Sequence, residues 1–125
     1  MRLLLDSHAL LWWLEDSPSL AAEAHAAIAE SANDVAVSAV SVWELEIKRA
    51  TGKLRAPAQL VHRIEAEDFE PLPITLEHGV AAGKLPLHHR DPFDRMLIAQ
   101  AQLEGLTIVT RDPRFDPYSV GTMPA

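Results

Sequence analysis

The chain has 125 residues, the size of one domain that buries roughly two-thirds of the surface its unfolded chain exposes. Its 48% hydrophobic and 23% charged residues are typical of a globular protein rather than a disordered or fibrous one. The formal charge of −7 argues against a protein that coats nucleic acid or an anionic membrane through bulk electrostatics, and the absence of cysteine excludes disulfides, Cys-ligated zinc, iron–sulfur clusters and thiol nucleophiles.

Three unalternating apolar runs predict short strands that are buried on both faces of a sheet. They are Leu3–Leu5, Val35–Val37 and Leu106–Val109. Residues 69–74 form a further extended piece, which its two prolines would confine to an edge of the sheet.

Apolar residues recur at helical spacing in six other segments, and Pro or Gly residues punctuate their ends. These segments are 8–15, 19–31, 42–51, 58–67, 75–84 and 93–104. Strands that alternate with helices predict an α/β fold, with one domain spanning residues 1–125 and a short parallel sheet of about four to five strands flanked by helices on both faces.

No segment predicts a membrane span. The uncharged stretch Val35–Trp43 has nine residues, whereas a spanning helix needs ~20. No small-residue cleavage site follows the N-terminal apolar run. We therefore expect a soluble, cytoplasmic and unprocessed protein.

Acidic residues stand next to the predicted strands with unusual regularity. Asp6 follows the first strand and Asp112 the third, while Glu44 lies in the helix after the second strand and Asp94 at the start of the helix before the third. In parallel α/β sheets, ligands bind beyond the carboxyl ends of the strands. The sequence therefore predicts four carboxylates on one rim of the sheet.

Three of these acids have an ordinary structural role open to them. Asp6 could cap the helix at 8–15, and Asp112 before Pro113 could start a turn. Glu44 could complete a capping box with Ser41. Each of these interpretations is as good as a functional one for the residue taken alone.

Asp94 is harder to explain by local structure. Asp91 takes the cap position and Pro92 the first helical position, so the local capping need is already met. At about 100° per residue, Asp94 falls on the apolar face with Leu97 and Ile98. A carboxylate in that position must be paired or bound to a cation, because an uncompensated buried charge is too costly.

Four acids on one rim would repel one another unless a cation lay between them. Mg²⁺ or Mn²⁺ is favoured, because hard cations prefer carboxylate oxygens and complete their shell with water and substrate phosphate. Zinc is less suitable because it favours His, and His88 and His89 are adjacent loop residues that rarely project to one point. Such an ion activates water and stabilises the attacking and leaving oxygens of phosphoryl displacement, so the chemistry implied is phosphodiester hydrolysis. No P-loop, dinucleotide-binding or nucleophile-elbow motif is present, which argues against nucleotide cofactors and a serine hydrolase.

The acids and their local sequences resemble the PIN-domain nucleases and, within them, the VapC-type toxins of bacterial toxin–antitoxin pairs. The likeness covers nearly the whole chain and lies in the stretches Leu4–Trp12, Val37–Glu44, Arg90–Ala101 and Val109–Asp112. The family often has Thr where Ser7 stands, a conservative difference that keeps a hydroxyl beside the first carboxylate.

The resemblance implies a ribonuclease that uses Mg²⁺ or Mn²⁺ to cut RNA, forms a homodimer and is silenced by an antitoxin protein. That partner reaches into the site with basic residues, and its other end binds operator DNA. By the same resemblance, Asp6 and Asp94 are direct metal ligands, whereas Glu44 and Asp112 ligate a second metal or orient the attacking water. Three further residues would contact the metal ligands and hold them in position: Ser7, Thr110 and Asp91.

Two other functions stay open. An Asp-nucleophile phosphatase also has an Asp at the end of its first strand, although that class has an acid or Thr where His8 stands. A non-catalytic interaction module on the same fold is the second alternative.

The tryptophans are assigned to packing rather than to RNA. Trp12 and Trp13 are adjacent and point about 100° apart on a helix, so one would pack inside and the other would serve a protein interface. Trp43, Ile47 and Ala50 share a helical face, which predicts a core position.

Overall fold

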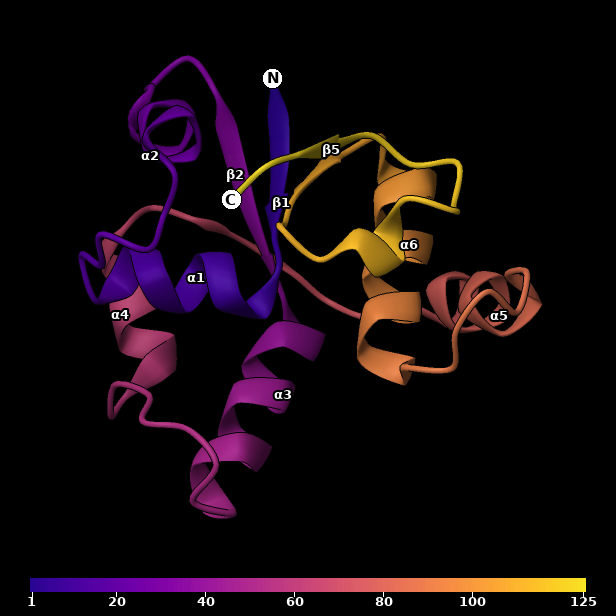
Figure 1. Cartoon of the computed structure of the whole chain (residues 1–125), viewed down its shortest axis with the longest axis horizontal. Helices are drawn as coiled ribbons and strands as arrows, with labels where there is room; N and C mark the ends of the chain where they lie inside the picture. The colour runs from indigo at the N-terminus through magenta and orange to yellow at the C-terminus, as the bar shows by residue number, and fades with distance from the viewer.

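The sheet of the computed structural model, which describes residues 1–125, has five parallel strands in the order β3-β2-β1-β4-β5 (Figure 1). The three predicted strands are confirmed, and the proline-containing piece forms the edge strand β3. The fifth strand was not predicted, because two residues are too few to make an apolar run. The strands are β1 Arg2–Leu5, β2 Asp34–Ser38, β3 Glu70–Leu72, β4 Thr107–Val109 and β5 Thr122–Met123.

All six predicted helices are present, together with one short 3₁₀ helix that the sequence indicated only as a turn. The second and third predicted helices differ most at their ends: α2 is shorter than expected, and α3 begins three residues earlier. The helices are α1 Ser7–Leu14, α2 Ala22–Ala29, α3 Ala39–Ala50, α4 Leu60–Ala66, α5 Leu76–Lys84, α6 Pro92–Glu104 and the 3₁₀ helix η1 Pro113–Phe115.

Helices cover both faces of the sheet, as predicted. Successive side chains of a strand point to opposite faces, and β1 shows this clearly. Leu3 and Leu5 lie in the core cluster formed with α1, α2 and α4, whereas Leu4 packs with Ile98 of α6 in the other cluster. Figure 1 shows α1, α2 and α4 to one side of the strands and α5 and α6 to the other.

The central strand β1 pairs with β2 on one side and with β4 on the other, so the strand order reverses at β1. Such a reversal opens a crevice at the carboxyl ends of the strands, because the connecting chains leave in opposite directions. In Figure 1 the first turns of α1, α3 and α6 gather at this end, beside η1. This arrangement sets the position of the acidic residues described below.

The predicted core face of α3 is wrong. Trp43 is 57% exposed and Ile47 38% exposed, and Ala50 is exposed as well. The buried face instead carries Ser41, Glu44 and two aliphatic residues. The apolar pattern was misleading because α3 lies across the carboxyl end of the sheet, where its buried side faces a polar site.

The two adjacent tryptophans do not divide into one core and one surface residue as expected. Both Trp12 and Trp13 are half-buried and pack against the core cluster of α1, α2 and α4. Trp13 lies against His25 and Phe69, with ring centroids 4.9 Å and 6.2 Å away.

None of the helices combines the length and the apolar character that crossing a membrane requires.

Candidate active site

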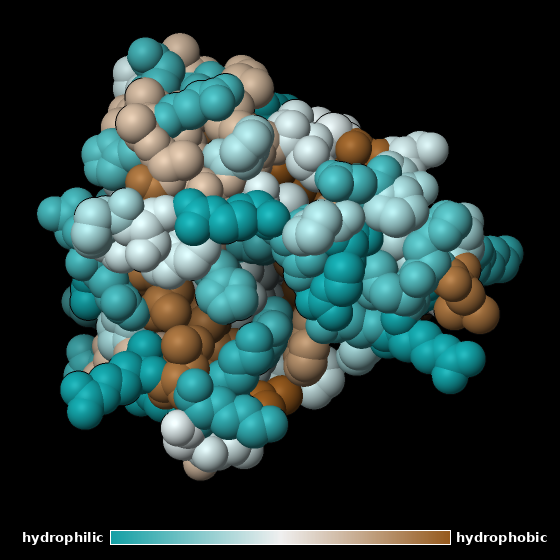
Figure 2. All heavy atoms as spheres, in the orientation of Figure 1, coloured by the Kyte–Doolittle hydropathy of each residue, from teal (hydrophilic) through white to brown (hydrophobic).

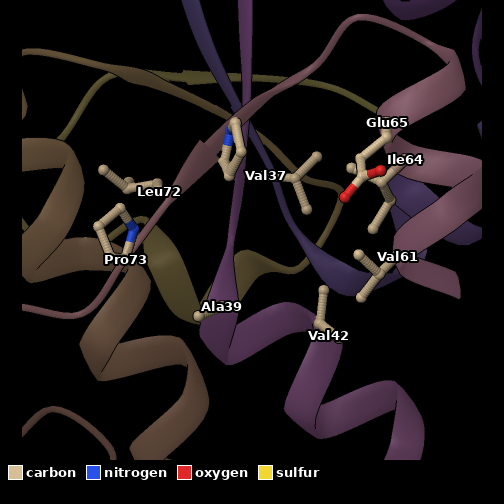
Figure 3. A pocket seen from close by; sticks show the side chains of 9 residues that line it. Val37, Ala39, Val42, Val61, Ile64, Glu65, Leu72 and Pro73 are labelled. Atoms are coloured by element: carbon tan, nitrogen blue, oxygen red, sulfur yellow. The ribbon is translucent and has the colours of Figure 1, made fainter.

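A hollow of about 420 Å³ between α3, α4 and β3 is lined mainly by aliphatic side chains and prolines (Figure 3). The exception is Glu65, its one charged residue. On the face drawn in Figure 2, hydrophobic residues gather between α4 and α3, whereas hydrophilic residues lie between α1 and α6. This lining has no cluster of basic or metal-ligating side chains, so it suits apolar contact rather than catalysis.

The structure brings three buried carboxylates together at the carboxyl end of the sheet. Asp6 lies between β1 and α1 and is 7% exposed, Glu44 on α3 is 7% exposed, and Asp94 on α6 is 8% exposed. They are close enough that the charge of Glu44 contributes to the raised pKa of both Asp6 and Asp94. Three acids that were dispersed in the sequence thus share one environment.

Asp6 has both a structural and a chemical role open to it. Its side chain caps α1 by accepting a hydrogen bond from the backbone nitrogen of Ala9 at 2.8 Å, as the ordinary interpretation predicted. Burial raises the pKa of Asp6, and this outweighs the opposing effects of the Thr110 hydroxyl, Ala9 and His8. The carboxylate therefore lies in surroundings that disfavour its charge.

Asp94 is held in place by its neighbour Asp91. The Asp91 carboxylate accepts hydrogen bonds from the backbone nitrogens of Phe93 at 2.9 Å and Asp94 at 3.1 Å, and Pro92 takes the first helical position as expected. Asp94 is thus free of capping and points inward. Burial, and then the charge of Asp91, raises the pKa of Asp94 to about 7.

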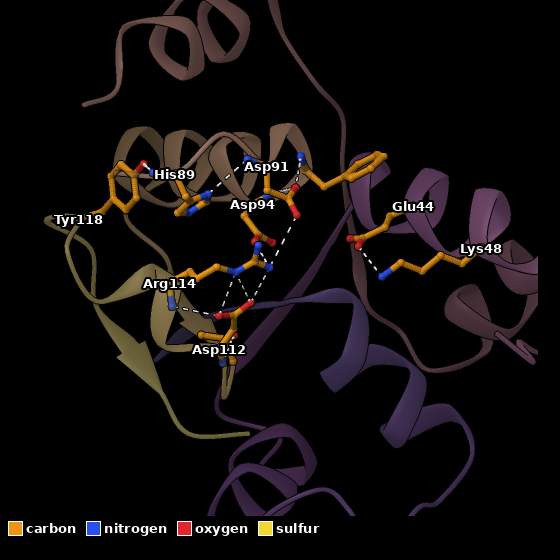
Figure 4. Close-up of polar contacts among 10 residues, drawn as sticks. Glu44, Lys48, His89, Asp91, Asp94, Asp112, Arg114 and Tyr118 are labelled. Atoms are coloured by element: carbon orange, nitrogen blue, oxygen red, sulfur yellow. Dashed lines mark hydrogen bonds and ion pairs between the residues drawn. The ribbon is translucent and has the colours of Figure 1, made fainter. Parts of the chain in front are cut away.

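Arg114, which sequence reasoning did not single out, bridges three of the acids (Figure 4). Its Nη2 atom lies 2.8 Å from Asp112 Oδ2, 3.0 Å from Asp94 Oδ2 and 3.7 Å from Asp91 Oδ2. The contact with Asp94 lacks hydrogen-bond geometry, so the buried Oδ2 atom of Asp94 accepts no hydrogen bond. The guanidinium is therefore a counter-ion for the cluster rather than a complete hydrogen-bond partner.

The turn predicted at Asp112 positions this arginine. Asp112 caps η1 by accepting a hydrogen bond from the backbone nitrogen of Arg114 at 2.9 Å, and its side chain bonds the guanidinium as well. Those hydrogen bonds hold the pKa of Asp112 below its usual range. The available sequence signal was the short spacing from Asp112 to Arg114 across Pro113.

Glu44 does not form the capping box suggested by its spacing from Ser41. The cap of α3 is Ser38, whose hydroxyl accepts a hydrogen bond from Val40, so Ser41 lies inside the helix and its buried hydroxyl has no partner. Glu44 pairs instead with Lys48 at 2.8 Å. Glu followed by Lys four residues later on a helix is a readable signal for such a pair.

Two residues named as supports also lie at the site. Thr110 is buried directly after β4, where its hydroxyl lowers the pKa of Asp6 and accepts a hydrogen bond from the backbone nitrogen of Asp112 at 3.1 Å. Thr110 therefore links the first and last acids. Ser7 is buried directly after Asp6.

The carboxylate oxygens of the site suit a hard cation, although their side chains do not meet at one point where an ion could bind. No three carboxyl or imidazole groups meet closely enough to hold a single ion, and Arg114 pairs with Asp94 and Asp112 instead. Three buried carboxylates, one with an unbonded oxygen, are nevertheless the ligands that Mg²⁺ and Mn²⁺ prefer. A metal at this rim would require the guanidinium to move away.

Known proteins resemble this chain in both sequence and fold. Residues 3–120 match the PIN domain family. The chain is 32% identical to Ribonuclease VapC22 of Mycobacterium tuberculosis (strain ATCC 25618 / H37Rv) over 114 residues, which are 89% of this chain and 87% of that protein.

The fold is similar to that of VapBC2 from Rickettsia felis, solved bound to a DNA fragment from its promoter, with a TM-score of 0.72, 16% identity and 98% of each chain covered. It is also similar to that of a toxin–antitoxin complex from Klebsiella pneumoniae, with a TM-score of 0.68, 19% identity and 97% and 95% of the two chains covered. At these identities the likeness to solved structures shows the fold alone.

Proposed function

The chain belongs to the PIN domain family and, within it, to the VapC-type proteins, and from this premise we propose that it is a divalent-metal-dependent endoribonuclease that acts as the toxin of a toxin–antitoxin pair. The observation that carries this proposal is the cluster of three buried carboxylates at the carboxyl end of the sheet, of which Asp6 and Asp94 have raised pKa values. Shifted pKa values of this kind concentrate at functional sites. The name of the Mycobacterium tuberculosis relative supports RNA as the substrate.

In this proposal Asp6 and Asp94 ligate Mg²⁺ or Mn²⁺, and Glu44 and Asp112 hold a second ion or orient the attacking water. A bound ion of this kind activates water and stabilises the attacking and leaving oxygens of a phosphodiester. Thr110 orients Asp6 through its hydroxyl, and Asp91 keeps Asp94 free by capping α6 in its place.

A cognate antitoxin is the proposed protein partner. Residues 1–83 carry 6 basic and 13 acidic residues, a net charge of −7, so most of the surface is suited to a basic partner. Basic side chains that reached the carboxylate rim would also neutralise Asp94 and Asp112. The proposed location is the cytoplasm, because the proposed RNA substrate is present there.

A homodimer is proposed through the exposed face of α3. Trp43 and Ile47 are exposed there, and the Trp43 ring packs edge-on against Phe93 of α6 with centroids 5.1 Å apart. Exposed aromatic and aliphatic side chains on one face are typical of protein interfaces. A second copy on this face would lie beside Glu44, whose backbone follows Trp43 directly.

The decisive experiment is cleavage of single-stranded RNA by the purified protein with Mg²⁺ or Mn²⁺. We expect Asp94→Asn to reduce the cleavage rate by more than about a hundredfold, because it removes a proposed metal ligand while keeping the size of the side chain. Asp68→Asn is the matched control: Asp68 is exposed, and its positive φ of 57° suits Asn as well. It should cleave like the wild type.

Two further measurements separate the alternatives. Hydrolysis of a small phosphomonoester without RNA cleavage would favour the phosphatase. A folded protein that neither cleaves RNA nor binds Mg²⁺ in titration calorimetry would favour the non-catalytic module. Equal RNA cleavage by wild type and Asp94→Asn would contradict the proposed mechanism.

A further inference from the structure

Two planar side chains project from α1 beside the carboxylates. His8 and Trp12 are four residues apart and therefore share one face of the helix. Their rings are stacked, with centroids 5.6 Å apart and planes inclined by 29°. His8 is exposed and Trp12 is half-buried. Solvent therefore reaches the pair at its His8 end, which is the end nearer to Asp6 in the chain.

Arg111 adds a third planar group. Its guanidinium carbon lies 4.4 Å from the centroid of the Trp12 ring. The guanidinium is fixed by hydrogen bonds to two backbone carbonyls: Nε donates to Ala125 at 3.0 Å, and Nη2 donates to Ala125 at 2.5 Å and to Ser19. Trp12 therefore contacts a guanidinium that the backbone holds in place.

A cavity of about 250 Å³ connects these planar groups with the acidic site. Its lining residues are Asp6, His8, Trp12, Arg111 and Asp112. This volume is below the ~300–1,000 Å³ of pockets that take drug-sized ligands, so it suits one small planar ring. Two of the five lining residues are proposed site acids, so a ring bound here would adjoin the reacting phosphate.

We propose, on the basis of the ribonuclease function above, that His8, Trp12 and Arg111 form a stacking subsite for one nucleobase of single-stranded RNA next to the scissile phosphate. Unpaired RNA bases stack on His and Trp rings and on Arg guanidinium planes. Stacking accepts every base, because each has a π-face, so the subsite holds the strand in place without selecting one nucleotide. A protein with a net charge of −7 attracts the phosphate backbone of RNA only weakly, and base stacking adds an attraction that does not depend on this charge.

The experiment measures kcat and KM for cleavage of a short single-stranded oligoribonucleotide by His8→Ala and His8→Phe. Removing one stacking partner weakens binding of a base by about tenfold, so we expect His8→Ala to raise KM about tenfold with little change in kcat. His8→Phe keeps a planar ring and should restore KM to near the wild-type value. His8 is exposed, so neither substitution should impair folding, which thermal melting followed by circular dichroism would check.

His25→Ala is the matched control. His25 is also an exposed histidine packed against a tryptophan, Trp13, with centroids 4.9 Å apart. No proposed site acid lines its surroundings, so KM should not change. The control separates loss of the subsite from general weakening of His–Trp packing.

A second measurement isolates the base. In an oligoribonucleotide with a single abasic nucleotide, the wild type should cut less at the phosphate whose subsite base is missing, and this deficit should be smaller for His8→Ala, which retains only Trp12 and Arg111. Unchanged KM in His8→Ala, failure of His8→Phe to restore it, or an equal effect of His25→Ala would each overturn the subsite while the ribonuclease function stood. Absence of RNA cleavage by the wild type would overturn the proposed function, and the subsite with it.

Discussion

At the scale of single residues, the burial of Asp94 disfavours the charged form of its carboxyl. Its carboxyl is buried on the apolar side of α6 and its pKa is raised to about 7 from an ordinary value of 3.8. Between these pH values the folded protein holds a proton that the unfolded chain has already released. The free energy of unfolding therefore falls as pH rises through this window, and the raised pKa of Asp6 acts in the same direction.

We accordingly predict that the metal-free protein becomes less stable from pH 5 to pH 7, and that Asp94→Asn makes this dependence shallower. Asp112 does not interfere, because its lowered pKa adds a contribution that is constant above its ordinary value and is lost only in more acidic solution. Urea unfolding at a series of pH values measures the effect. A slope that is identical in wild type and Asp94→Asn would contradict the prediction.

Metal addition should reverse the same dependence. A divalent ion binds the deprotonated carboxylates, so its affinity rises with pH as protons leave. We predict that saturating Mg²⁺ raises the melting temperature more at pH 8 than at pH 5. Asp94→Asn should lose most of that difference, whereas Asp68→Asn should keep it.

At the scale of the elements, the start of α6 shows how local capping prepares a site. Because Asp91 satisfies the first backbone N–H groups of the helix, the carboxylate of Asp94 is left for other partners. This division of roles was readable in the sequence from the order Asp, Pro, Phe, Asp.

Asp91→Ala should destabilise the protein by about 1 kcal/mol, the usual cost of losing an N-cap. Asp91→Asn should stay within a few tenths of the wild-type value, because Asn caps about as well as Asp. Chemical denaturation of both variants tests this. Equal stability of Asp91→Ala and Asp91→Asn would show that the cap contributes little.

The buried faces of some helices depend on their tertiary position and could not be predicted from the sequence. Helix α3 has the apolar spacing of a core helix, yet Trp43 is exposed and Glu44 buried, because its inner side faces the acidic rim. His78 on α5 is likewise buried. Its Nδ1 accepts from the backbone nitrogen of Thr75 at 3.0 Å, and its Nε2 lies 2.9 Å from Glu104 of α6. Nothing in the spacing predicted that pairing between helices.

At the scale of the whole molecule, the sheet order gathers the ends of distant segments at one rim. The acidic positions could be predicted to meet there, because parallel strands carry their carboxyl ends to one edge. The position of Arg114 could not be predicted, because it depends on the tertiary packing of η1 against α6. The rim was therefore predictable as a place, but not as a set of contacts.

The proposed homodimer belongs to this scale. We predict that the wild type elutes as a dimer in size-exclusion chromatography with light scattering, and that Trp43→Glu is a monomer, because a charge would be buried at the interface. Leu76→Glu, which changes a 91% exposed residue on α5, is the control and should stay dimeric. A dimeric Trp43→Glu would assign the interface elsewhere.

The bridge from Arg114 to Asp91, Asp94 and Asp112 has a consequence for the order in which the protein matures. The chain supplies its own positive charge to the acids, so it can reach its native shape before an ion is available. In the proposed function, folding and ion binding are then separate events, because the ion pairs with Arg114 already balance these carboxylates in the folded chain. Supply of the ion would then set when the molecule starts work, independently of when it folded.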